Sequence, residues 1–232
     1  MPVTDDLRTI APVQEYRERS HPDALFRASM LGYCPRKQLL AAKGINLRLT
    51  DNLSRKYAMH GGSHDRVQEW IEKTLGDKYG QVLTEHKIFD PETRCGGHID
   101  AVVVDANTAH VIEIKTYAFL PKGYDFDNAY WVNQISFYYH AVMDLEDWPL
   151  VQPIVLIVTL DGYVRVVEPN ITDEHKGILS LLNMQWDLDL LPSYTDCHNK
   201  DCAKCPLQSV CTEPIESIAE FAEEVQRRAI QE

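Results

Sequence analysis

Hydrophobic and polar positions follow two different repeats along the chain. From Leu25 to Ala42 and from Leu53 to Leu75 the apolar residues recur at helical spacing, and the second pattern stops before Gly76. Short runs rich in β-branched residues then predict strands. These runs are Gln81 to Phe89, His98 to Val104, His110 to Lys115, Pro153 to Leu160 and Tyr163 to Val167. The chain therefore changes from a helical to a strand-rich region near residue 80.

Helical patterns also interrupt the strand-rich region. Asn128 to Met143 fits a helix between the third and fourth predicted strands, and Thr172 to Asp187 fits another after the last strand. A helix between two strands is typical of a crossover connection, so we predict an α/β fold with a mixed central β-sheet flanked by helices. Asp105 to Thr108 has the composition of a turn, which predicts an antiparallel hairpin around it.

The tail of the chain is first polar and cysteine-rich and then helical. We therefore expect three regions: a helical amino-terminal region at 1–80, a strand-rich core at 81–190, and a cysteine-rich tail with a terminal helix at 191–232. One face of the terminal helix is apolar and is expected to pack on the rest of the protein. Its residues are Ile215, Ile218, Phe221, Ala222 and Val225.

Composition limits the function. The formal charge of −12 argues against a protein that coats nucleic acid nonspecifically. No apolar stretch approaches the length of a membrane span, and Met1 to Arg8 lacks a signal-peptide core, so we expect a soluble, cytoplasmic protein with no membrane partner. One stretch is locally basic, and it fits either a solvated helical surface or a face that binds a nucleic acid strand. Its basic residues are Arg36, Lys37, Lys43, Arg48, Arg55, Lys56 and Arg66.

Two carboxylates and a lysine follow one another through the predicted hairpin. Asp100 ends the sequence Gly97-His98-Ile99-Asp100, and Glu113 and Lys115 project from the same face of the next strand. If Asp100 lies beside Glu113, the pair can hold a hard divalent cation, with Lys115 near the metal-bound water. This is the chemistry of phosphodiester hydrolysis. The alternative is a solvated strand face, but the apolar surroundings require partners for these charges.

A helical histidine and a polar pair extend this set. His64 lies on the helix face expected to meet the sheet, and the preceding Gly61 and Gly62 would allow a close approach. His64 is either a metal ligand or a hydrogen-bonded structural histidine. Gln134 and Tyr138 are four residues apart and share a face of the crossover helix.

In this order the motifs resemble the RecB-like branch of the PD-(D/E)XK nuclease superfamily. The resemblance extends over about residues 57 to 138. It implies that His64, Asp100, Glu113 and the backbone carbonyl of Ile114 bind Mg²⁺ or Mn²⁺. It also implies that Lys115 positions or activates the attacking water, and that Gln134 and Tyr138 are associated with the active site and with DNA.

The cysteines indicate a second metal centre. Four of the six crowd the tail, at Cys197, Cys202, Cys205 and Cys211, and the Cys-x-x-Cys pair within them suits zinc as well as iron-sulfur chemistry. Cys95 is interpreted as an unligated core or loop thiol.

The cysteine pattern resembles the iron-sulfur subgroup of these nucleases, which includes CRISPR adaptation exonucleases, the AddB nuclease domain and phage relatives. The resemblance implies a four-iron, four-sulfur cluster on Cys34, Cys202, Cys205 and Cys211, which would clamp the amino-terminal helices to the tail. If Cys197 replaced Cys34, all ligands would be local and a zinc knuckle would be favoured.

The leading hypothesis is a metal-dependent DNA exonuclease in CRISPR spacer acquisition or in phage recombination and repair. Its expected partners are DNA, single-stranded or with free ends, and the integration or recombination proteins of those pathways. One alternative is a DNA-end-binding assembly subunit with little or no turnover. Another is a zinc-containing structural protein, which would leave Asp100, Glu113 and Lys115 without a role.

Overall fold

The computed structural model describes residues 21–45, 51–79, 81–120, 123–126, 130–146, 148–193, 205 and 207–229. In the long helix that begins at residue 51, side chains are described from residue 62 onward. Cys197 and Cys202 lie outside the described residues, as do the side chains of Arg48, Arg55 and Lys56.

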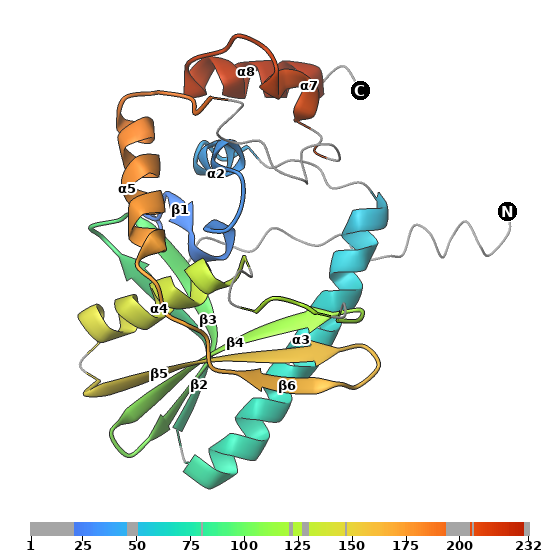
Figure 1. The fold of residues 1–232 in the computed structure, drawn as a ribbon, viewed down its shortest axis with the longest axis vertical. Coiled ribbons are helices and arrows are strands. Elements are labelled where there is room, and N and C mark those ends of the chain that lie inside the picture. The colour runs from blue at the N-terminus through green and yellow to red at the C-terminus, as the bar shows by residue number, and fades with distance from the viewer. Residues whose placement is uncertain are drawn as a thin grey trace, which may run out of the picture.

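The described chain contains both strands and helices (Figure 1). The strands are β1 (Phe26–Arg27), β2 (Gln81–Asp90), β3 (Cys95–Asp105), β4 (Thr108–Tyr117), β5 (Leu150–Thr159) and β6 (Val164–Val167). The helices are the 3-10 helix η1 (Ala28–Met30), α2 (Pro35–Ala42), α3 (Asp51–Tyr79), α4 (Val132–Leu145), α5 (Glu174–Asp187), α7 (Gln208–Cys211) and α8 (Ile218–Ala229).

The strands form one mixed sheet in the order β1-β3-β4-β5-β6, with β2 paired to β3 as well. Strands β3 and β4 are antiparallel and turn over two residues, with Asp105 opposite Thr108. The left-handed backbone of Ala106 (φ 51°) makes this tight turn possible. Helix α4 then crosses over so that β4 and β5 run parallel. The predicted mixed sheet and its hairpin are both confirmed.

Helices cover both faces of the sheet. On one face Ile71 of α3 packs against Ile112 and Ile114 of β4, so these isoleucines point into a core as expected. On the other face α4 contributes Ile135 and Val142 to the larger core. Both faces of the central strands are buried, which explains their nearly continuous β-branched sequence.

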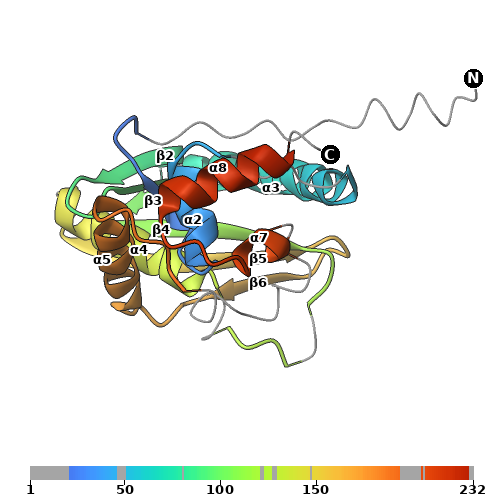
Figure 2. The same ribbon diagram turned by 90° about the horizontal axis from the view of Figure 1, so that it is seen from above.

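The terminal helix packs on the amino-terminal segment. Phe221, Ala222 and Val225 of its apolar stripe are buried with Leu40 of α2 in a separate small core, and Ile218 joins the main core. Helix α8 lies close to α2 in both ribbon views (Figures 1 and 2). This confirms that the stripe packs on the rest of the protein. Its buried members are Ile218, Phe221, Ala222 and Val225.

Arg36 joins the same two parts of the chain through polar contacts. Its guanidinium donates to the carbonyl oxygens of Pro192 (2.8 Å) and Cys211 (3.0 Å) and lies 5.3 Å from the centre of the Phe221 ring. The side chain is only 3% exposed. Arg36 is therefore a clamp between α2 and the tail, and the hypothesis that it belongs to a strand-binding surface is wrong.

Three local predictions about the helices are wrong. The pattern from Leu25 predicted one helix, but β1 and η1 come first and α2 begins at Pro35, because proline fits the first turn of a helix and not its interior. Helix α3 continues through Gly76 to Tyr79, where packing outweighs the low helix propensity of glycine. Gly62 serves no close approach, since a Cβ there would meet nothing within 4 Å.

Among the described helices, none combines the length and the apolar character needed to cross a bilayer.

The Arg36 clamp can be tested by stability measurements. Arg36→Gln removes the donor from two buried carbonyl oxygens, and each unsatisfied group costs about 1 to 3 kcal/mol. We expect the free energy of unfolding in urea to fall by about 2 to 5 kcal/mol. Lys37→Gln, on the same helix, is the matched control and should change it by less than about 0.5 kcal/mol. Equal stability of the two variants would contradict the clamp.

Candidate active site

The candidate site lies where strands β3 and β4 separate. Their ladder ends at the pair Ala101 and Ile112, while β1 pairs with the same edge of β3 at Cys95 and Gly96. Between these two pairings, no described strand pairs with this edge of β3 at residues 97–100. Backbone groups in this gap need other partners, and side chains of the site supply them.

Asp100 fills one side of the gap. The residue is 4% exposed, and its Oδ2 accepts a hydrogen bond from the backbone N–H of Ile114 at 2.7 Å. The Nε2 of His64, from α3, lies 3.0 Å from the same oxygen. Because N–H and C=O of one strand residue point toward the same neighbour, the Ile114 carbonyl also faces this opening.

Glu113 lies at the centre of the site. Its Oε1 accepts hydrogen bonds from Lys115 Nζ (2.7 Å) and Gln134 Nε2 (2.9 Å), and Lys115 also donates to Gln134 Oε1 at 2.8 Å. The strand places Glu113 and Lys115 on one face, as predicted, and α4 brings Gln134 to both. The other carboxylate oxygen, Glu113 Oε2, is buried and accepts no hydrogen bond among the described residues.

Burial dominates the electrostatics of this site. It raises the pKa of Glu113 to about 7, and the charge of Asp100 acts in the same direction while Lys115 opposes it. Burial by itself would lower the pKa of Lys115, but the charge and the hydrogen bond of Glu113 outweigh it and the pKa is raised. Lys115 therefore stays charged beside a carboxylate whose proton is exchangeable near neutrality.

Tyr138 fills the rest of the gap. Its hydroxyl donates to the backbone carbonyl of His98 at 3.0 Å and lies 3.3 Å from Gln134 Nε2. A Cβ at Gly97 would lie 2.4 Å from this hydroxyl, so the position accepts only glycine while Tyr138 stays in place. The four-residue spacing thus lets one turn of α4 contact Glu113 through Gln134 and the next turn contact the backbone of β3 through Tyr138.

The donor set suits a hard divalent cation. Carboxylate oxygens and a backbone carbonyl are the ligands such ions prefer, and Glu113 Oε2 is a buried acceptor available for one. As the side chains stand, no group of three or more His, Cys, Asp or Glu residues in the described chain is arranged to hold a metal ion. His64 and Asp100 contact each other, so both would have to exchange that contact for the ion.

Comparison with known proteins identifies the family. The model of the PD-(D/E)XK nuclease superfamily matches residues 21–212, most of the chain and all of the residues just described. The chain belongs to this superfamily. In a comparison with curated proteins, no sequence matched this nuclease.

Two solved structures resemble the nuclease. SSO0001 is 18% identical, with a TM-score of 0.52, over 93% of this chain and 98% of that one. A proposed exonuclease from Eubacterium rectale is 12% identical, with a TM-score of 0.43, over 76% of this chain and 84% of that one. The first likeness supports the fold alone, and the second is too weak to carry an argument.

Two residues of the nuclease site were missed from the sequence. Gln68 donates to the backbone carbonyl of Asp100 at 2.7 Å and lies 3.4 Å from a carboxylate oxygen of Glu85. Glu85 has a left-handed backbone (φ 49°) within β2, at the level of Asp100. The helical spacing of Gln68 four residues after His64 was a usable signal, whereas nothing in the sequence marks Glu85.

An aromatic pair borders Lys115. Lys115 Nζ lies 5.6 Å from the centre of the Tyr130 ring, and this ring packs against Tyr33 at 5.4 Å between centroids. Gly32 allows this contact, because a Cβ there would lie 2.3 Å from the Tyr130 carbonyl oxygen. The segment just before Cys34 therefore packs beside the nuclease site.

Three of the predicted cluster ligands lie in one neighbourhood. Burial raises the pKa of the Cys211 thiol, Arg36 opposes it, and Cys34 and Cys205 raise it further through their charges. None of these three thiols forms a disulfide among the described residues, and they come from opposite ends of the chain. Cys95 is also free and fully buried in the main core, as expected for an unligated thiol.

Gly97→Ala tests the fit of Tyr138 in the gap. The added methyl group must displace a buried, hydrogen-bonded ring, so we expect a loss of about 1 to 3 kcal/mol in unfolding free energy, measured in urea. Gly76→Ala is the matched control: it adds a methyl group where nothing lies within 4 Å and should stabilise α3 by about 0.5 to 1 kcal/mol. A Gly97→Ala variant as stable as the parent would refute the tight fit.

Proposed function

We propose that this nuclease is a metal-dependent DNA exonuclease. The observation that carries the proposal is the buried Glu113 Oε2, an acceptor left open beside Asp100 in a site that already holds a charged lysine. A buried carboxylate oxygen without a partner is costly, and a cation would satisfy it. Superfamily membership supports the class of reaction.

Each residue has a proposed role. Asp100, Glu113, His64 and the Ile114 carbonyl would hold Mg²⁺ or Mn²⁺, which polarises the phosphate and lowers the pKa of bound water. The Lys115 ammonium faces the charge that develops on the phosphate. Gln134 holds Glu113 and Lys115 beside each other through its hydrogen bonds, and Tyr138 positions Gln134 and the backbone of His98. Glu113 and Lys115 therefore do not need to reorganise during the reaction.

The pathway in this proposal comes from the sequence resemblance. That resemblance assigns the exonuclease to CRISPR spacer acquisition or to phage recombination and repair, acting on DNA that is single-stranded or has free ends. An end-binding assembly subunit is the second candidate.

A four-iron, four-sulfur cluster on Cys34, Cys202, Cys205 and Cys211 is part of the same proposal. Its support is the proximity of the three described thiols, brought together where Arg36 joins α2 to the tail. The role of such a cluster would be structural, because it would bind segments that lie far apart in the sequence.

Loss of a metal ligand or of the lysine should abolish cleavage. We expect Glu113→Gln, Asp100→Asn and Lys115→Ala each to lower the rate of Mg²⁺- or Mn²⁺-dependent degradation of end-labelled DNA by about 100-fold to 1000-fold, because each removes a preorganised charge. A chelator should stop the parent enzyme, and covalently closed circular DNA should resist it.

The control for these variants is Asp105→Asn, which changes an exposed carboxylate at the end of β3, the strand of Asp100. This variant should cleave DNA like the parent. Full cleavage by Glu113→Gln, or cleavage that a chelator leaves unchanged, would refute the metal site. Tight binding of DNA ends without turnover in any metal would select the assembly subunit.

Removal of a cluster ligand should lower the iron content. We expect protein purified without oxygen to be brown and to contain iron and sulfide, and Cys34→Ala or Cys205→Ala to lose both together with soluble yield. Cys95→Ala is the control and should keep its iron. Stoichiometric zinc without iron would refute the cluster, and iron lost in Cys197→Ala but kept in Cys34→Ala would assign all ligands to the tail.

A further inference from the structure

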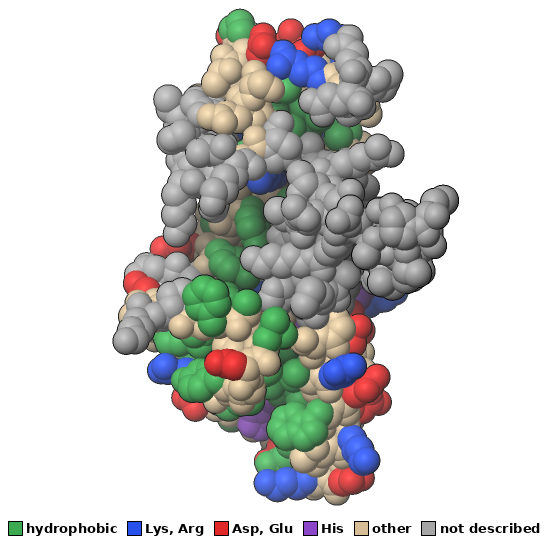
Figure 3. Space-filling view, turned by 90° about the vertical axis from the view of Figure 1, so that its right-hand side faces the viewer, with side chains coloured by type: hydrophobic (Ala, Val, Ile, Leu, Met, Phe, Trp, Pro, Cys, Tyr) green, Lys and Arg blue, Asp and Glu red, His purple; other side chains and the backbone are tan. Residues whose placement is uncertain are grey.

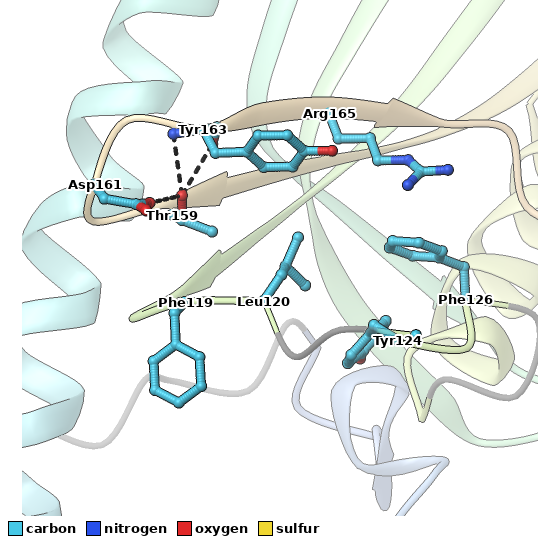
Figure 4. Close-up of a pocket in the computed structure, with 9 residues that line it drawn as sticks. Phe119, Leu120, Tyr124, Phe126, Thr159, Asp161, Tyr163 and Arg165 are labelled. Atoms are coloured by element: carbon cyan, nitrogen blue, oxygen red, sulfur yellow. Dashed lines mark hydrogen bonds between the residues drawn. The ribbon is translucent and has the colours of Figure 1, made fainter.

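A second cavity opens beside the nuclease site, between the segment after β4 and the β5–β6 hairpin. Its volume is about 430 Å³. Phe119 and Phe126 stand on one side of it, and Tyr163 and Arg165 of the hairpin on the other (Figure 4). The cavity thus has aromatic walls on two independent segments, with a cation on one of them.

The walls are suited to a flat aromatic ligand. The Arg165 guanidinium lies 4.3 Å from the centre of the Phe126 ring, as in a cation–π pair. Phe119 is 70% exposed and Tyr163 is 48% exposed. Figure 3 views the molecule from the side of α3 and the β5–β6 turn, and hydrophobic side chains stand open to solvent there among charged ones. Large rings left in water are costly unless a ligand covers them.

A hydrogen bond connects the cavity wall to the strand that carries Lys115. Tyr124, which lines it, shares a hydrogen bond of 2.9 Å with the hydroxyl of Tyr117. Tyr117 follows Lys115 by two residues on β4 and so lies on the same face of the strand. A ligand that extends from the cavity to the face of β4 with Lys115 would therefore pass Tyr124 and then Tyr117.

The cavity wall carries one negative and one positive side chain, Asp161 and Arg165, so it has no net charge to attract a phosphate. Asp161 lines the cavity and accepts a hydrogen bond from Thr159, which lowers the pKa of the aspartate and keeps it ionised. A carboxylate in the wall repels the phosphate backbone, whereas bases stack on aromatic rings and arginine planes. Bases in a duplex are already stacked and paired, so only an unpaired base can enter.

We propose that this cavity binds an unpaired base of the single-stranded DNA whose backbone enters the nuclease site. The inference rests on the proposed nuclease function and adds to it a subsite for an unpaired base. Arg165, held over the Phe126 ring, forms the stacking platform, and the exposed Phe119 supports the neighbouring base.

The test measures binding apart from cleavage. In a Glu113→Gln background, the fluorescence anisotropy of a labelled single-stranded oligonucleotide reports affinity. Phe126→Ala and Arg165→Ala should each weaken binding roughly 5-fold to 100-fold, as expected for the loss of one stacking partner. Phe126→Trp should keep the affinity. Lys176→Ala, an exposed cation on α5, is the matched control for Arg165→Ala and should leave the affinity unchanged.

An abasic oligonucleotide of equal length separates bases from phosphates. It should bind more weakly than the normal strand and should not respond to Phe126→Ala or Arg165→Ala. Unchanged binding of the normal strand by Arg165→Ala, in protein with parental thermal stability, would overturn the base site even if the parent enzyme cleaves DNA. An inactive parent enzyme whose strand binding still depends on Phe126 and Arg165 would support the base site and refute the nuclease.

Discussion

The burial of one carboxylate governs this structure. Glu113 is 3% exposed at the centre of a sheet covered on both faces, where an isolated charge would cost several kcal/mol. Lys115 on β4 and Gln134 on α4 both donate hydrogen bonds that stabilise one of its oxygens. The other oxygen accepts no hydrogen bond from the described chain, and burial, together with the charge of Asp100, raises the pKa of Glu113 to about 7. The open carboxylate oxygen of Glu113 therefore favours the binding of a cation.

Separation of β3 from β4 makes room for this arrangement. A continued ladder would pair the backbone of residues 97–100 with β4 and leave no opening. Asp100 and Tyr138 instead satisfy the freed backbone groups of Ile114 and His98, so the gap is stable without strand pairing. The same two side chains thus complete the fold and shape the site, and Tyr138 leaves no room for a side chain at Gly97.

The sequence predicted most of the sheet and most of the site because both depend on local patterns. Alternation along β4 predicts that Glu113 and Lys115 share a face, and helical spacing joins Gln134 to Tyr138. It could not reveal contacts between distant segments. The packing of Gly32 on Tyr130 and the burial of Arg36 depend on how the tail returns to α2, and neither has a periodic signal. For the same reason the basic stretch wrongly predicted a surface position for Arg36.

Those distant contacts connect the cysteine-rich region to the active site. Arg36 fixes α2 to the tail, and Cys34 caps the start of the same helix. Two residues earlier, Gly32 lies directly on the backbone of Tyr130, whose ring lies beside Lys115. A shift of α2 would therefore move Tyr130 against the lysine, since close-packed groups transmit displacements. Metal ligation at Cys34 would in this way stabilise the geometry of the nuclease site without contacting it.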